Sequence, residues 1–151
     1  MVMTPHMPAV ARSSISGLTL PVLDSSHWTP ARPASERRVS IVSSAGISRR
    51  DDKPFSWLAR DSRSIRKSDR DLMMTHVAVD YDRTAWQQDL NAIFPVDRLE
   101  EMAADGEIGS LAQEHYSFMG ATDPGNMEES ARETAERMRQ DDVNTVFLVP
   151  V

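Results

Sequence analysis

The side chains of this sequence best suited to acid–base chemistry are two histidines, His76 and His115, because imidazole titrates near neutral pH. His76 comes at the end of an apolar stretch that is predicted to be a strand, and His115 opens another. A histidine delivered by the end of a strand can contact a substrate or donate a proton to it. We therefore predict catalytic roles for both, with a structural role as the alternative for each.

Metal and thiol chemistry find less support in the sequence. His76 with Asp80 and Asp82 could supply three metal ligands, but all three fall in irregular chain, and none of the four histidines has a partner at the spacing of a helical metal site. The chain contains no cysteine, which excludes disulfides, zinc thiolate sites and a catalytic thiol within it. We expect no bound metal ion and no bound cofactor.

A polar cluster in the segment "DLNAIFPVDRL" is the candidate substrate-binding site. Its members are Asp89, Asn91, Asp97 and Arg98. They are expected to form a polar loop at the carboxyl edge of a sheet. The alternative is loop capping, in which Asn91 and Asp97 bond backbone N–H groups while Ile93 and Phe94 fill the core.

Alternating strand and helix patterns must position these residues. Strands are expected over 38–43, 64–67, 71–77, 115–119 and 145–149, helices over 97–106 and 127–140, and a helical turn at 84–90. This alternation predicts an α/β fold with a mostly parallel, Rossmann-like sheet flanked by helices and incomplete at its C-terminus. Residues 1–23 are expected to be a disordered leader, and residues 24–151 a single domain.

Composition and charge argue against membrane and nucleic-acid functions. The chain is 40% apolar and 26% charged, and no run approaches the roughly 20 apolar residues of a membrane span. Its net charge of −6 combines a basic stretch over residues 32–70 with an acidic C-terminal third. No nucleic-acid recognition motif accompanies the basic stretch, so we interpret it as a solvated face.

Several segments, taken in order, resemble the selenoprotein B family of the glycine, sarcosine, betaine and D-proline reductases. They are "WTP", "RVSIVSSAGI", "LMMTHV", "DLNAIFPVDRLEEMAADGEIGSLAQEHYSFMG" and the final "RQDDVNTVFLVPV". The resemblance extends from Leu18 to Val151, and the block from Asp89 to Gly120 is its most specific part. One departure is the loop after His76, which keeps only the run "DYD" where the family has a denser set of His, Asp and Tyr.

The resemblance implies a reductase subunit whose reactive residue lies beyond this sequence. In the family, a strand like "VNTVFLVPV" leads directly into a selenocysteine, with a cysteine a few residues later. Selenocysteine is encoded by UGA, which ordinary gene calling reads as a stop. The chain is therefore expected to be the N-terminal part of a longer selenoprotein, inactive by itself, with the selenocysteine directly after Val151.

The resemblance also implies a reaction and its partners. A pyruvoyl group on a partner subunit activates a small amino-acid-like substrate, which the selenolate attacks. A C–N bond is then cleaved reductively, with electrons from a dithiol or a thioredoxin-type reductant. An oligomeric cytoplasmic enzyme is expected, and the alternative is a non-catalytic, Rossmann-like binding or redox-regulatory module.

Overall fold

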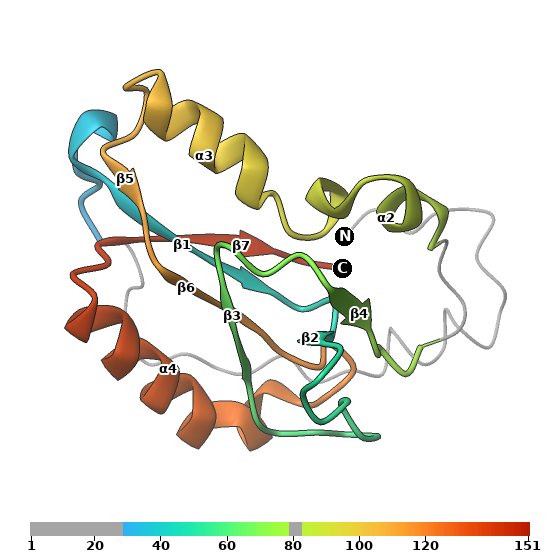
Figure 1. Cartoon of the computed structure of the whole chain (residues 1–151). Coiled ribbons are helices and arrows are strands. Elements are labelled where there is room, and N and C mark those ends of the chain that lie inside the picture. The colour runs from blue at the N-terminus through green and yellow to red at the C-terminus, as the bar shows by residue number, and fades with distance from the viewer. Residues whose placement is uncertain (1–28, 79–82) are drawn as a thin grey trace, which may run out of the picture.

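A mixed β-sheet lies between two helices in the computed structural model, which describes residues 29–78 and 83–151. Helix α3 (Val96–Ala104) covers one face of the sheet and helix α4 (Glu128–Gln140) covers the other (Figure 1). The short helix α2 (Thr84–Gln88) lies beyond one end of the sheet on the α3 side (Figure 1). The fold predicted as α/β is therefore confirmed in its class.

Strand β1 (Arg38–Ser43) is the centre of the main sheet. Strand β7 (Thr145–Val149) pairs with one side of β1 over its whole length. On the other side, β5 (Ser110–Leu111) pairs with the start of β1 and β6 (Glu114–Ser117) with its end. All three pairings with β1 are parallel.

The remaining strands make the structure mixed. The main sheet is mostly parallel, as predicted, but it is not the purely parallel sheet of a Rossmann-like fold. Strand β3 (Arg63–Arg66) pairs antiparallel with the outer side of β6. Strands β2 (Ile47–Arg49) and β4 (Leu72–Met74) form a separate antiparallel ribbon. The segment between β1 and β4 has no apolar helical period. It therefore provides no crossover helix, which the strands that directly follow β1 in the chain would need to pair with it in parallel.

Three short 3₁₀ turns complete the described elements. They are η1 (Ala34–Glu36), η2 (Leu90–Ala92) and η3 (Pro124–Met127). Turn η3 leads directly into α4, whose first turn carries Glu128 and Glu129 and whose last turn carries Arg137 and Arg139. These charges oppose the helix dipole and stabilise a helix that has few buried residues.

The main core lies between the sheet and α3. Phe94, Val96 and Ile41 are fully buried there, and Leu99 of α3 packs against them. Helix α3 ends where Gly106 adopts φ +75°, a left-handed conformation that glycine reaches without steric cost. The leader predicted over residues 1–23 lies outside the described residues.

Candidate active site at the carboxyl edge of the sheet

The three parallel strands β1, β6 and β7 end side by side, at what we call the carboxyl edge. In the register of the sheet, Ser43 lies opposite both Ser117 and Val149. The contact continues beyond the strands, because the Ser44 N–H donates to the Val149 carbonyl oxygen at 3.0 Å. Ligands of α/β proteins bind outside the carboxyl ends of such strands, so this edge is the candidate site.

His76 lies against this edge and is only 7% exposed. Two glycines make room for it. A β-carbon at Gly120 would lie 3.2 Å from His76 Nε2 and 3.1 Å from Ser44 Cβ. At Gly46, where φ is +63°, a β-carbon would lie 3.1 Å from His76 Cα. The imidazole and the Ser44 side chain therefore both lie directly against Gly120.

The hydrogen bonds of His76 indicate where its proton lies. Its Nδ1 accepts a hydrogen bond from the Ala78 N–H at 3.1 Å. A ring nitrogen that accepts a hydrogen bond carries no proton, so the neutral ring carries its proton on Nε2. Nε2 is the atom that lies against Gly120, and the described residues enclose it. His76 thus points an N–H toward Gly120 at the carboxyl edge, and its role as a proton donor stays a prediction.

Ser44 ties the chain that follows β7 to the same edge. The Val151 N–H donates to Ser44 Oγ at 2.8 Å, and the Gly120 N–H donates to the Ser44 carbonyl oxygen at 3.0 Å. Ser44 therefore lies between the ends of β6 and β7. In a longer chain, the residue after Val151 would directly follow a residue that Ser44 holds by a hydrogen bond.

Replacing Gly120 with alanine should destabilise the protein and displace His76. The added β-carbon would lie 2.7 Å from the Ser44 backbone oxygen, a contact that only a backbone shift can relieve. We expect a loss of about 1–3 kcal/mol in the free energy of unfolding, measured by urea denaturation. Gly125→Ala is the matched control, because its β-carbon meets its nearest atom at 3.4 Å, an ordinary contact. Equal stabilities of the two variants would contradict this account of Gly120.

Three members of the predicted substrate-binding cluster, Asp89, Asn91 and Asp97, form a connected network around the start of α3. Asp89 Oδ1 accepts from the Asn91 N–H at 2.9 Å and from Asn91 Nδ2 at 2.8 Å, which lowers the pKa of Asp89 below its usual value. Asn91 Oδ1 accepts from the Asp97 N–H at 3.1 Å. Arg98 pairs with Glu101 one turn along the helix.

The capping alternative holds in part. Asn91 bonds a backbone N–H as that alternative requires, but the Asp97 carboxylate accepts from the Asn91 and Arg70 side chains instead. Ile93 and Phe94 are buried beneath these contacts. The same segment reaches the carboxyl edge through its backbone, because Ser43 Oγ donates to the Ile93 carbonyl oxygen at 2.9 Å. Substrate binding by the four side chains stays a prediction.

His115, the second predicted catalytic histidine, lies inside the core rather than on the surface. It is fully buried, with its ring edge-on to Phe94 at a centroid distance of 5.6 Å. Its Nδ1 accepts from the Ile41 N–H at 3.2 Å. Strand alternation indicates that His115 and Tyr116 point to opposite faces of the sheet, but not which of them faces α3. The burial of His115 could therefore not be predicted from the sequence.

Burial of His115 should make the protein less stable in acid. Desolvation of the charged ring lowers the pKa of His115 from 6.5 to about 4. The unfolded chain therefore binds more protons than the folded one between these values, so stability falls as pH falls through 6.5 toward 4. We expect a loss of about 3 kcal/mol over this range.

Urea denaturation at a series of pH values measures this loss, and His115→Asn is the matched variant. Asparagine can keep an acceptor for the Ile41 N–H but does not titrate, so its stability should vary less between pH 6.5 and 4. Identical pH profiles for the two proteins would show that another group is responsible.

An apolar hollow of about 470 Å³ opens beside the carboxyl edge on its α4 side. Its walls include Val42, Phe118, Met127, Leu148 and Pro150. No local sequence pattern indicates this hollow, because its walls come from segments that are far apart in the chain. It is large enough for a small organic molecule or for side chains of another segment.

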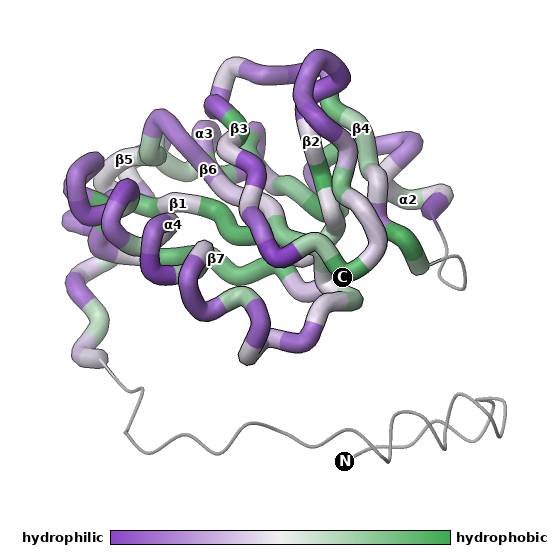
Figure 2. Tube along the Cα trace, turned by 90° about the horizontal axis from the view of Figure 1, so that it is seen from below, coloured by the Kyte–Doolittle hydropathy of each residue, from purple (hydrophilic) through white to green (hydrophobic). Residues whose placement is uncertain are grey.

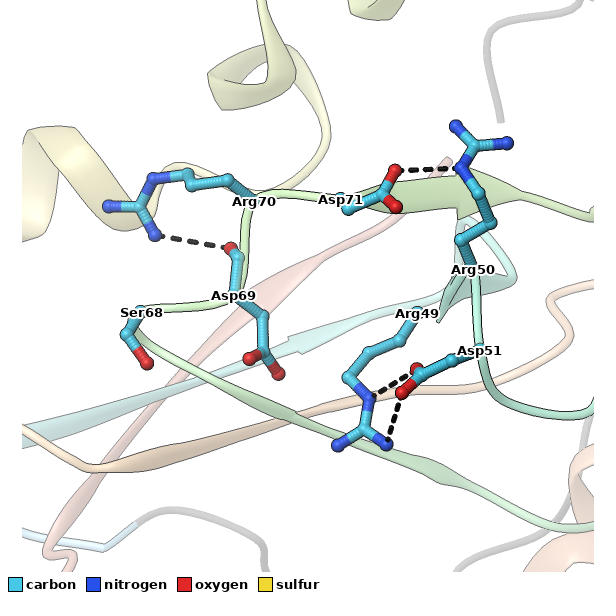
Figure 3. A pocket seen from close by; sticks show the side chains of 7 residues that line it. All are labelled: Arg49, Arg50, Asp51, Ser68, Asp69, Arg70 and Asp71. Carbon is cyan, nitrogen blue, oxygen red and sulfur yellow. Dashed lines mark hydrogen bonds and ion pairs between the residues drawn. The ribbon is translucent and has the colours of Figure 1, made fainter.

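A second, charged hollow lies at the far end of the β2–β4 ribbon. Arg49, Arg50 and Arg70 line it together with three aspartates (Figure 3). Arg49 pairs with Asp51 and Arg50 with Asp71, so the opposite charges largely compensate one another. Asp80 and Asp82, considered with His76 as metal ligands, lie outside the described residues. Within residues 29–78 and 83–151, no group of three His, Cys, Asp or Glu side chains could hold a metal ion.

No helix in the described ranges is both long and apolar enough to cross a bilayer.

Comparison with known proteins gives the chain a family. The D-proline reductase subunit gamma of Acetoanaerobium sticklandii is 28% identical over an alignment of 145 residues that covers 92% of this chain and 59% of that protein. The chain thus spans about three fifths of the length of this curated relative. No solved structure matches it. The model of the glycine/sarcosine/betaine reductase selenoprotein B family matches residues 18–151, and the chain belongs to that family.

Proposed function

We propose that this chain is the N-terminal part of a selenocysteine-dependent reductase subunit that cleaves a C–N bond of a small amino-acid-like substrate. The observation that carries the proposal is the convergence of His76, Ser44 and Val151 at the carboxyl edge, in a chain that matches a reductase family over residues 18–151. In this proposal the selenocysteine follows Val151 and completes the site.

The residues of this chain prepare the site for a nucleophile. A selenol is more acidic than a thiol, whose pKa is near 8.5, and is therefore ionised and nucleophilic at neutral pH. Ser44 fixes the backbone of Val151 by its hydrogen bond at 2.8 Å, so the next residue starts from a defined position. The Nε2–H of His76 lies at the same edge, and in this proposal it gives a proton to the departing amine.

The electron balance of the reaction requires partners. The carbon–nitrogen bond breaks as the selenolate attacks the carbon, and the nitrogen leaves with the bonding electrons and takes up a proton. A dithiol or thioredoxin-type reductant returns two electrons to release the product and the selenolate. A pyruvoyl group on a partner subunit would activate the substrate through its carbonyl. We place this oligomeric enzyme in the cytoplasm, where such reductants keep selenols and thiols reduced.

The nucleotide sequence after codon 151 tests the proposal most directly. We expect a UGA codon there, an open reading frame that continues beyond it with a cysteine codon a few positions later, and an RNA hairpin nearby. A selenium-containing protein of the corresponding mass, measured by mass spectrometry on material from the native cell, would support it. A UAA or UAG codon at this position would refute it.

A further inference from the structure

Strand β7 has the composition of an interior strand but the position of an edge strand. Val146, Phe147 and Leu148 are 43%, 46% and 70% exposed. Consecutive residues of a strand point to opposite faces, so apolar side chains are exposed on both faces of β7. Parallel strands with unbroken apolar runs are typically buried on both faces. The sequence of β7 is therefore typical of a strand that is buried on both faces, and the described residues leave both faces of β7 partly exposed.

The backbone of β7 is also only half paired. It pairs in parallel with β1 over five residue pairs, and no strand of residues 29–78 or 83–151 pairs with its other side. Figure 2 shows β7 as an apolar stretch beside the largely hydrophilic α4. A regular, apolar and unpaired strand edge readily accepts another strand.

The apolar hollow at the carboxyl edge lies between this strand and α4. A second hollow of about 490 Å³ follows the surface of α4 alone and adjoins the first at Ala131. Ala135, one turn further along α4, also lines the second hollow, whose other walls are charged side chains of the helix. Small side chains one turn apart allow another helix to pack closely. We call these two adjoining hollows the β7–α4 groove.

We propose that the segment that follows Val151 in the longer protein fills the β7–α4 groove with a helix and then adds a strand parallel to the free edge of β7. The chain already passes from β6 through α4 to β7, crossing β1 on the α4 side of the sheet (Figure 1). Parallel crossovers are almost always right-handed. A further right-handed crossover, from β7 to a new strand on its free side, continues in the same direction across the sheet. Its helix therefore lies on the same face as α4, over Leu148.

The length of the relative allows such a segment. This chain matches 59% of the D-proline reductase subunit gamma, which leaves roughly two fifths of that protein, and a helix with its strands needs about 30 residues. The inference rests on the proposed function only in requiring a chain that continues past Val151. The covering helix would close the open side of the apolar hollow and shield the site from water.

Cysteine labelling of the longer protein tests the inference, because residues 1–151 contain no cysteine to interfere. The selenocysteine and any cysteine beyond Val151 are first replaced by serine. Leu148→Cys and Trp57→Cys are then compared, since both side chains are 70% exposed in the structure described here. We expect a maleimide to label Leu148→Cys at least about tenfold more slowly than Trp57→Cys in the folded protein, and at an equal rate in denaturant.

Each outcome of this experiment is decisive. Equal labelling rates in the folded protein would overturn the inference. Protection that disappears on dilution would identify a second copy of the chain as the occupant, and protection lost on deletion of residues 1–28 would identify that segment. A gene without codons beyond 151 would also overturn it. A longer chain that protects Leu148→Cys but encodes no selenocysteine would keep the inference and refute the proposed function.

Discussion

The 151-residue chain should show no reductase turnover with any amino-acid substrate, even with a dithiol and the partner subunit present, whereas the longer selenocysteine protein that we propose should turn over. The chain holds no selenol and no thiol, so neither His76 nor Ser44 has a nucleophile to assist. Loss of a nucleophile from a site that acts as a unit costs at least about 10⁴-fold in turnover. The measurement is amine release at saturating substrate.

Two comparisons make this result interpretable. A longer protein with cysteine in place of selenocysteine should keep a reduced but measurable rate, because a thiolate is a weaker nucleophile that forms at higher pH. A longer protein with serine at that position should match the 151-residue chain. Turnover by the 151-residue chain would refute the assignment of the missing residue as the nucleophile.

His76→Ala in the longer protein should lower turnover by about 10²-fold or more, the low end of what a general acid contributes. The substitution removes the Nε2–H that borders the carboxyl edge. The ring is buried, so the variant should also lose about 1–3 kcal/mol of stability. The rate is therefore expressed per folded molecule, with the folded fraction taken from circular dichroism at the assay temperature.

His76→Gln separates proton donation from positioning. A glutamine amide can occupy the place of Nε2 and donate a hydrogen bond, but it cannot transfer a proton. We expect this variant to remain as slow as alanine, while its KM stays close to that of the unaltered protein. Trp57→Ala, at an exposed position, is the control for general effects of substitution. If His76→Ala keeps full activity per folded molecule, His76 is a structural residue.

The elements with strong local patterns were predicted closely from the sequence. Strand β7 has the predicted bounds, because an apolar run after a helix end is a clear signal. Helix α4 begins at Glu128, one residue after the predicted start. Strands β2 and β5 were missed, since three and two residues are too few to show a period.

The pairing of strands and the burial of side chains could not be predicted from local sequence patterns. Strand β3 was expected at nearly its observed place, but local pattern does not show that it runs antiparallel to β6. The chain position of His76 placed it after a strand, and the structure places it at the carboxyl edge through Gly46 and Gly120. Those contacts join residues far apart in the sequence, so no local pattern encodes them.

The buried serines of the central strand have a consequence for how the sheet finds its alignment. Ser40 Oγ donates to the Glu114 carbonyl oxygen at 2.9 Å, and Ser117 Oγ donates to that of Ser43 at 3.2 Å while accepting from the Ile47 N–H. Sliding β1 by one residue would turn Ser40 and Ser43 to the opposite face and leave buried hydroxyls without partners, at about 1–3 kcal/mol each. A purely aliphatic β1 would bury more apolar area but would tolerate such a slip. The buried hydroxyls thus favour a single register between β1 and its neighbouring strands. That register decides which residue of each strand lies at the carboxyl edge.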